Sequence, residues 1–251
     1  MSTVAVCAGK GSPGATFVAV NLAAAMQRQG DETLLLDLDP SAGDIAAYLG
    51  LDPRRGVYPL LKMDAKLPTS EGLLKESEER EGMLVVGGFP EMLPIVAPDI
   101  LSYFVKLGAD TGRAVVADLG RVGGDTPTAL KGAQKVLVVV RPDLVSVLGA
   151  ERAIRVLERG GISHDAISVV ICGIERRRPG DVQEVADALH LPILGTIPLH
   201  RAHSRKALVG QAAISEGPLA KAFRSLAEKL ARELTGAVAS VIEPRAIGVV
   251  A

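Results

Sequence analysis

The chain alternates short apolar runs, rich in Val, Ile and Leu, with longer stretches in which apolar residues recur every three or four positions. Nearly continuous apolar runs are typical of strands that are buried on both faces of a sheet, and the wider spacing is typical of amphipathic helices. We therefore predict an α/β fold of three layers, with helices on both faces of a mainly parallel sheet. The predicted strands are residues 3–8, 33–37, 83–86, 114–118, 135–140, 167–172 and 193–197.

Two helices are predicted from their periodicity. The first follows residue 14 and repeats apolar side chains at Val18, Leu22 and Met26, and the last begins near Pro218, a residue suited to a first helical turn. The charged stretch 75–81 is predicted to be an exposed helix end. Neither an internal repeat nor a domain boundary is evident, so we predict one domain over residues 1–251, with 237–251 as a flexible tail or a segment packed on the body.

Composition narrows the possible partners. With 48% apolar residues among 251 and a net charge of −1, the chain has no overall field that would attract nucleic acid or an anionic membrane. It shows no secretory signal and no apolar stretch near the roughly 20 residues that span a bilayer, which predicts a cytoplasmic protein with at most peripheral membrane contact. Cys7 and Cys172 lie in apolar runs and are predicted to be core thiols.

The most informative segment is the first strand with the turn and helix that follow it. A phosphate-binding loop of the form G-x-x-x-x-G-K-[ST] requires this context, because backbone N–H groups and the helix N-terminus then converge on phosphate oxygens. Gly9 and Gly14 occupy the two glycine positions and Thr16 the hydroxyl position, but Ala15 stands where lysine is expected. The pattern therefore predicts an anion-binding loop that lacks its central cation.

These residues resemble the deviant Walker A family, which includes MinD, ParA and the pilus-associated CpaE/TadZ proteins. The resemblance implies a P-loop NTPase fold, binding of ATP or ADP with Mg²⁺, and a homodimer in which Lys10, at the place of the family's signature lysine, reaches the partner's phosphate. It extends along the chain through residues 138–146 and 191–198. The loop residues that it implies for nucleotide binding are Gly9, Lys10, Gly11, Ser12, Pro13, Gly14, Ala15, Thr16 and Phe17.

The same resemblance assigns roles to three acidic residues. Asp39 lies in the segment Leu-Asp-Leu-Asp-Pro, where the family orients the attacking water, so Asp39 and Lys10 are the implied catalytic residues. Asp118 lies in a segment similar to the Walker B strand. Thr16, Asp37 and Asp118 are the implied magnesium ligands.

Two departures from the family pattern affect what the protein can do. Loss of one charge-assisted contact at Ala15 is worth roughly 1.5–3 kcal/mol, or about ten- to a hundredfold in affinity. Deleting one preorganised donor commonly costs about 10² to 10³ in rate, so hydrolysis should suffer more than binding. Cys172 and Gly173 stand where the family places an asparagine that reads adenine. One rescue hypothesis is that Lys10 folds back onto its own subunit's phosphate.

Several features have simpler interpretations. The loop at residues 9–16 could be a turn that merely joins strand to helix, and Asp39 or Asp118, taken singly, could be helix caps or strand-end carboxylates. His200 and His203 have a spacing compatible with metal, but without a nearby third ligand a surface position is favoured. A basic patch from residues 175–178 with Arg201, Arg205 and Lys206 could contact DNA phosphates, although a solvated loop is favoured. The tail is a poor match to a membrane-targeting helix.

Two classes of function remain open. In the first, an ATP-dependent dimer recruits a protein partner during partitioning, division-site placement or pilus and secretion assembly, with slow hydrolysis or none. In the second, the fold is a pseudo-ATPase scaffold that presents an interaction surface without nucleotide switching. A metabolic P-loop enzyme of the dethiobiotin synthetase or nitrogenase iron protein kind is disfavoured, because cysteines spaced to bridge a cluster and an evident substrate motif are lacking.

Overall fold

We describe the fold from a computed structural model. It describes residues 2–11, 13–62, 67–89, 96–174, 180–199, 210 and 215–242, with the backbone alone for 180, 181 and 236–242. Ser12, His200, His203 and all of the predicted basic patch lie outside these residues. No helix within the described ranges is both long enough and apolar enough to span a bilayer.

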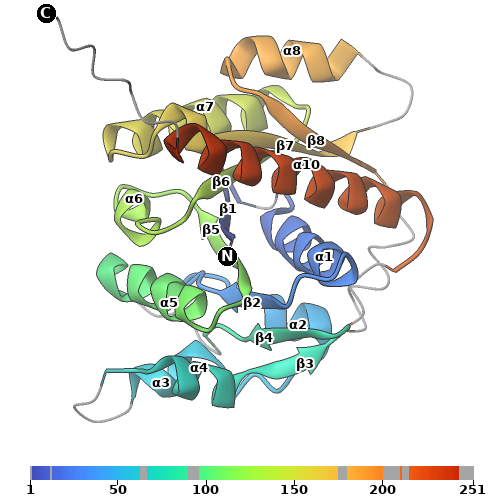
Figure 1. The fold of residues 1–251 in the computed structure, drawn as a ribbon. Helices are drawn as coiled ribbons and strands as arrows, with labels where there is room; N and C mark the ends of the chain where they lie inside the picture. The colour runs from blue at the N-terminus through green and yellow to red at the C-terminus, as the bar shows by residue number, and fades with distance from the viewer. Residues whose placement is uncertain are drawn as a thin grey trace, which may run out of the picture.

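An eight-stranded sheet organises the protein, in the order β3-β4-β2-β5-β1-β6-β7-β8 (Figure 1). Every neighbouring pair is parallel except β3 with β4, which is antiparallel. The carboxyl ends of the parallel strands therefore lie along one edge of the sheet. The strands are β1 Thr3–Ala8, β2 Thr33–Asp37, β3 Glu78–Arg80, β4 Met83–Val86, β5 Ala114–Arg121, β6 Lys135–Val140, β7 Ile167–Ile174 and β8 Ile193–Pro198.

Helices cover both faces of the sheet, which confirms the predicted three-layer architecture. One face is covered by α1 (Ala15–Arg28), α2 (Ile45–Leu49) and α10 (Gly217–Ile242), and Figure 1 shows α1 lying beside α10. A short 3₁₀ helix, His164–Ala166, precedes β7. On the other face lie α3 Val57–Leu61, α4 Ser70–Glu76, α5 Pro98–Asp110, α6 Thr126–Ala129, α7 Leu144–Arg159 and α8 Gly180–Leu189.

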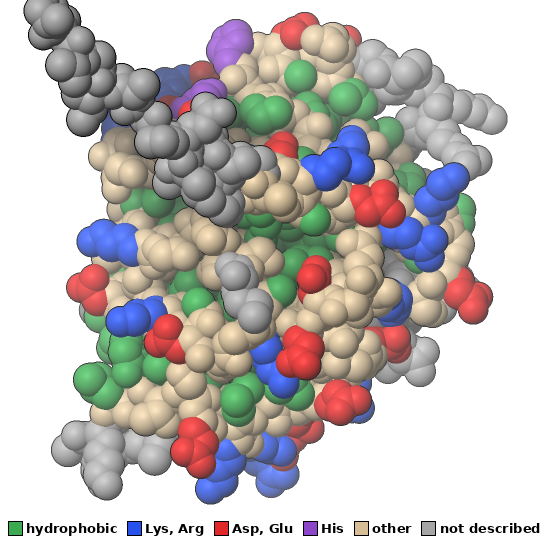
Figure 2. All heavy atoms as spheres, in the orientation of Figure 1, with side chains coloured by type: hydrophobic (Ala, Val, Ile, Leu, Met, Phe, Trp, Pro, Cys, Tyr) green, Lys and Arg blue, Asp and Glu red, His purple; other side chains and the backbone are tan. Residues whose placement is uncertain are grey.

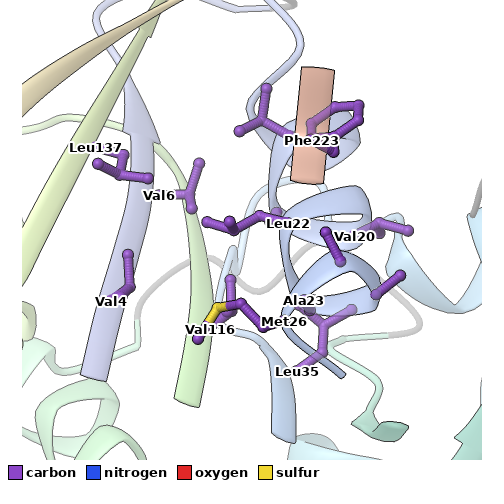
Figure 3. Close-up of a cluster of buried hydrophobic side chains, with 14 of the residues drawn as sticks. Val4, Val6, Val20, Leu22, Ala23, Met26, Leu35, Val116, Leu137 and Phe223 are labelled. Atoms are coloured by element: carbon purple, nitrogen blue, oxygen red, sulfur yellow. The ribbon is translucent and has the colours of Figure 1, made fainter. Parts of the chain in front are cut away.

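The periodicity of α1 explains its position. Leu22 and Met26 project from the helix toward the sheet, where Val6 and Val116 lie (Figure 3), and all four side chains are buried. Phe223 of α10 packs onto the same cluster. Because full burial of one such side chain stabilises the fold by roughly 1.5–3 kcal/mol, these contacts fix α1, and with it the loop that precedes α1, against the sheet.

Three details differ from the sequence expectation. The stretch 75–81 is not a helix end: α4 stops at Glu76 and Glu78–Arg80 forms the edge strand β3. A charged edge strand with one neighbour lacks the apolar run that identifies a central strand. Strands β5, β7 and β8 continue past the predicted ends at residues 118, 172 and 197. The last helix continues to Ile242, into the range predicted as a tail.

Candidate functional site

The loop between β1 and α1 keeps the backbone form that its glycines predict. Gly14 has φ +102°, a left-handed conformation that side chains other than glycine rarely adopt, and α1 begins at the next residue, Ala15. Gly9 is required for a different reason, since a Cβ there would overlap the carbonyl oxygen of Gly149 in α7. The loop is thus held between the body of α1 and the backbone of α7.

Within the described residues, the amino end of α1 has neither a capping side chain nor an acidic residue of its own first turn. Its N-cap residue, Gly14, has no side chain to accept a hydrogen bond, and the first turn contains no acidic residue. The first N–H groups of a helix have no intrahelical partner, and the helix dipole adds partial positive charge at this end. This helix end therefore has the electrostatic character of an anion-binding site.

The residues of the loop and the first turn of α1 differ in burial. Ala15 is only 7% exposed and packs in the core under the helix. Phe17 turns away from the loop, because its ring meets that of Phe223 edge-on with centroids 5.6 Å apart. Pro13 is buried and Gly11 is exposed. Side-chain contacts of Phe17 therefore serve packing, and only its backbone N–H would be available to a phosphate.

Lys10 is paired within its own chain. Its Nζ lies 3.9 Å from Oδ1 of Asp143, the N-cap residue of α7. The same Asp143 oxygen accepts the N–H of Ser146 at 2.8 Å. The lysine side chain is 36% exposed, so this pair is a weak surface contact that an incoming ligand or subunit can displace.

Asp37 and Asp118 are neighbours at the carboxyl edge of the sheet. The two residues are register partners across β2 and β5, and both are buried. The Thr16 hydroxyl donates a hydrogen bond to the Asp118 carboxylate, which also accepts the N–H of Gly120 at 3.1 Å. The first turn of α1 is thereby joined to the end of β5.

Asp37 and Asp39 organise the loop that follows β2. The Asp37 oxygens accept the N–H groups of Asp39 at 3.3 Å and Ile45 at 3.0 Å. Oδ1 of Asp39 accepts the N–H groups of Ser41 at 2.9 Å and Ala42 at 3.2 Å. Each Asp37 oxygen thus accepts one backbone N–H, and this residue fixes the loop that follows β2. Of the three implied ligands, Thr16 and Asp118 are directly joined.

The buried acids are short of positive charge. Burial, followed by the charge of Asp118, raises the pKa of Asp37 well above its usual range. Burial also raises the pKa of Asp118 to about 6, against the opposing effect of the hydrogen bond from Thr16. The Asp44 pKa is raised by burial and by Asp39. A cation at this edge of the sheet would therefore relieve unfavourable electrostatic free energy.

Magnesium fits this arrangement in a limited way. A hydroxyl and a carboxylate are the hard oxygen ligands that Mg²⁺ prefers, and Thr16 and Asp118 supply them side by side. Among the described residues, no three His, Cys, Asp or Glu side chains are arranged to hold a metal ion. Mg²⁺ would therefore need phosphate oxygens and water to complete its shell, which is its common mode of binding. When bound, the ion would supply charge neutralisation at those phosphates.

The sequence did not single out four residues that border the loop: Arg141, Asp143, Gly149 and Arg121. The first two flank a proline directly after β6, and such a charged pair at a strand end is the signal that would have identified them.

A cavity of 350 Å³ also opens beside Asp39, lined in part by Arg121 and Asp125. Cys172 is half-buried near Gly14, where a Cβ would lie 3.1 Å from its Sγ, and desolvation raises the pKa of Cys172 to about 11.

The first strand of this parallel sheet leads through a glycine loop into an uncapped helix, and a Thr–Asp pair lies at the carboxyl edge. This combination defines a P-loop α/β protein. The family model described as the CobQ/CobB/MinD/ParA nucleotide binding domain matches residues 4–213. The chain belongs to this family. The predicted fold and the predicted resemblance are both confirmed at this level.

Relatives and solved structures agree with the assignment. An uncharacterised ATP-binding protein of Methanocaldococcus jannaschii is 26% identical over 90% of this chain and 86% of that protein. The septum site-determining protein MinD of Thermotoga maritima is 26% identical over 78% of this chain and 75% of its own.

Two solved structures share the fold. MinD in the MinC:MinD cell division complex of Aquifex aeolicus has a TM-score of 0.78, 19% identity and coverage of 92% of this chain and 96% of that one. MinD of Pyrococcus horikoshii complexed with Mg-ADP has a TM-score of 0.66, 18% identity and coverage of 92% and 96% respectively.

Proposed function

We propose that this protein is a MinD/ParA-like switch that binds adenine nucleotide with Mg²⁺, hydrolyses it slowly or not at all, and positions a protein partner inside the cell. The observation that carries the proposal is the retained cradle: an uncapped α1 behind a left-handed Gly14, with Thr16 bonded to Asp118. The left-handed Gly14 lets the chain pass directly from the loop into α1, and the half-buried Thr16 with the buried Asp118 supplies two oxygen ligands beside that helix end.

The nucleotide part of the proposal draws on the relatives. The Pyrococcus horikoshii MinD structure contains Mg-ADP, and the Methanocaldococcus jannaschii relative is described as ATP-binding. This chain presents Thr16 and Asp118 for the metal and the first N–H groups of α1 for the phosphates. The cellular process in which the protein acts is likewise inferred from family likeness. The candidate processes are chromosome or plasmid partitioning, division-site placement, and pilus and secretion assembly.

Slow hydrolysis follows from what the loop lacks. No ammonium can reach the phosphates from Ala15, and removal of one such donor commonly lowers a rate by about 10² to 10³. Asp39, the residue proposed to orient water, keeps one oxygen on the Ser41 and Ala42 N–H groups. It is therefore held in place but has only its second oxygen for a water molecule.

A homodimer is proposed across the loop face. Beside Lys10, the start of α7 exposes Leu144 (73%), Val145 (61%) and Leu148 (45%). Apolar side chains that are exposed together next to a ligand site are typical of a face that a partner covers. Among the described residues on the face shown in Figure 2, acidic and basic side chains are interspersed.

Calorimetric titration of MgATP, combined with size-exclusion chromatography and a phosphate-release assay, tests the proposal. We expect saturable binding, a nucleotide-dependent shift from monomer to dimer, and little or no turnover. Leu144→Asp should abolish the shift while leaving MgATP binding by the monomer intact, with the distant exposed Leu67→Asp as the matched control. Absence of any nucleotide binding by the wild-type protein would overturn the proposal.

The alternative is a scaffold that uses the fold without nucleotide switching. Two observations favour it: Ala15 has no charge, and Lys10 already has a partner in Asp143. A constant oligomeric state, with and without MgATP, together with no calorimetric signal, would establish the scaffold.

A further inference from the structure

Arg141 follows β6 at the carboxyl edge of the sheet. Strand β6 lies beside β1, and their register pairs Ala8 with Val139. The next residues of the two strands, which include Lys10 and Arg141, therefore leave the sheet edge next to one another. Arg141 directly follows β6, and its N–H donates to the Ser146 hydroxyl at 2.9 Å, which fixes its backbone against the start of α7.

Its guanidinium lies over the next strand end. A Cβ on Gly173 would lie 3.8 Å from Cζ of Arg141, so the guanidinium covers the glycine that follows Cys172. Cys172 in turn lies close to Gly14, the last loop residue before α1, because a Cβ on Gly14 would lie 3.1 Å from its Sγ. The positive charge of Arg141 opposes the effect of burial on the Cys172 pKa, in agreement with this proximity. A chain of contacts thus leads from the guanidinium to the loop.

Asp143 holds both cations of this region. Its Oδ1 lies 3.9 Å from Lys10 Nζ, and its Oδ2 lies 3.8 Å from Arg141 Nε. All three side chains are at least 36% exposed. Ion pairs this long and this exposed contribute little to stability, so the cations can leave Asp143 without a large cost in free energy.

We propose that Arg141 makes a cationic contact to the nucleotide's polyphosphate, the contact that Ala15 cannot make. In the ligand-free protein, Asp143 pairs with Arg141 and Lys10, and both cations leave it when the polyphosphate binds. The planar guanidinium has five N–H donors and is charged at every physiological pH, which suits it to phosphate oxygens. The inference rests on the proposed function, because it places a residue in the same site. On this proposal, Arg141, which follows β6, is a nucleotide-binding residue.

Titration calorimetry with two probes, MgATP and inorganic tripolyphosphate, tests this assignment on the full-length chain. Tripolyphosphate has no base or sugar, so a contact to the polyphosphate must affect both probes. We expect Arg141→Gln to lower the affinity for each probe by about tenfold, and Arg141→Lys to retain part of the affinity. Arg54→Gln, which removes the same charge from a surface ion pair with Asp52, is the matched control and should change neither.

A second variant changes affinity in the opposite direction. Asp143→Asn removes the competing charge, but its side-chain oxygen can still accept the N–H of Ser146 and cap α7. We expect several-fold tighter binding of both probes. A gain of affinity cannot come from damage to the fold, so this variant keeps the proposal testable even if Arg141→Gln is unstable.

The outcomes separate the two proposals. If the wild-type protein binds neither probe, the proposed function fails and this inference with it. If the wild-type protein binds and Arg141→Gln binds equally well, only the assignment of Arg141 is wrong. Loss confined to MgATP would place the guanidinium on the nucleoside and would also overturn the assignment, as would an Asp143→Asn variant with unchanged or weaker affinity.

Discussion

The hydroxyl of Thr16 donates a hydrogen bond to the buried carboxylate of Asp118. This bond connects the first turn of α1 with the end of β5, two elements that are about a hundred residues apart in the chain. It also brings together the two oxygen ligands proposed for Mg²⁺. The pair therefore links the stability of the ligand-free protein to the proposed metal site.

We predict that Asp118→Asn stabilises the ligand-free protein near neutral pH. The folded-state pKa of about 6 lies above 3.8, the ordinary value for an aspartate, so the ionised carboxylate disfavours the folded state. This contribution is small below pH 4, grows as the pH rises from about 4 to 6, and amounts to roughly 3 kcal/mol above pH 7. Asparagine keeps an oxygen for the N–H of Gly120 and has no charge. Urea unfolding at pH 4 and pH 7.5 measures the difference.

The expected result is a gain for the variant of about 1–3 kcal/mol at pH 7.5 that disappears at pH 4. The same variant should lose the Mg²⁺ dependence of nucleotide binding, which titration with and without EDTA would reveal. An equal effect at both pH values would show that the charge of Asp118 is not responsible.

Gly9→Ala should disrupt the loop. The added Cβ would overlap the Gly149 carbonyl of α7, and overpacking of this kind typically costs about 1–3 kcal/mol. Gly11→Ala is the matched control, because nothing lies within 4 Å of a Cβ at that position. Thermal denaturation should show a lower midpoint for Gly9→Ala alone. Equal midpoints would mean that α7 moves away readily and does not brace the loop.

Ala15→Lys should restore affinity and turnover. An ammonium at this position would contact the phosphates and raise nucleotide affinity by about tenfold, with measurable phosphate release. Ala15→Met adds comparable length without charge and controls for crowding at this largely buried position. If the lysine variant binds no better than the methionine variant, other parts of the site have decayed as well.

Glu233→Ala should destabilise the protein by about 1–3 kcal/mol. Lys135 is nearly buried, and its Nζ lies 2.6 Å from Oε2 of Glu233 and 2.9 Å from the Asp165 carbonyl. Removing the carboxylate leaves that ammonium without its counter-charge at the amino end of β6. Glu32→Ala, in the exposed pair with Arg113, should cost less than about 1 kcal/mol. Urea unfolding compares the two, and equal losses would contradict a special role for Lys135.

Local patterns in the sequence were sufficient for the central architecture and for the loop. Runs such as residues 135–140 read as buried strands because both of their faces are covered, and the spacing of Val18, Leu22 and Met26 identifies the face of α1 that packs on the sheet. The positions of Gly9, Gly14 and Thr16 are likewise local, since a phosphate loop is built from consecutive residues. Edge strand β3 was missed because its charged residues have no apolar face to reveal them.

Only the tertiary structure decided which distant side chains border that loop. The sheet order β1-β6-β7 places Cys172 near Gly14, and the start of α7 brings Asp143 to Lys10 and Gly149 against Gly9. These contacts join residues more than a hundred positions apart, and no local periodicity records them. The sequence by itself therefore determined the seven mutually parallel strands and the first helix, and it predicted the anion cradle, because short-range sterics and burial govern these segments. The charges around the cradle depend on strand order, which is fixed when the whole sheet packs against its two helical layers.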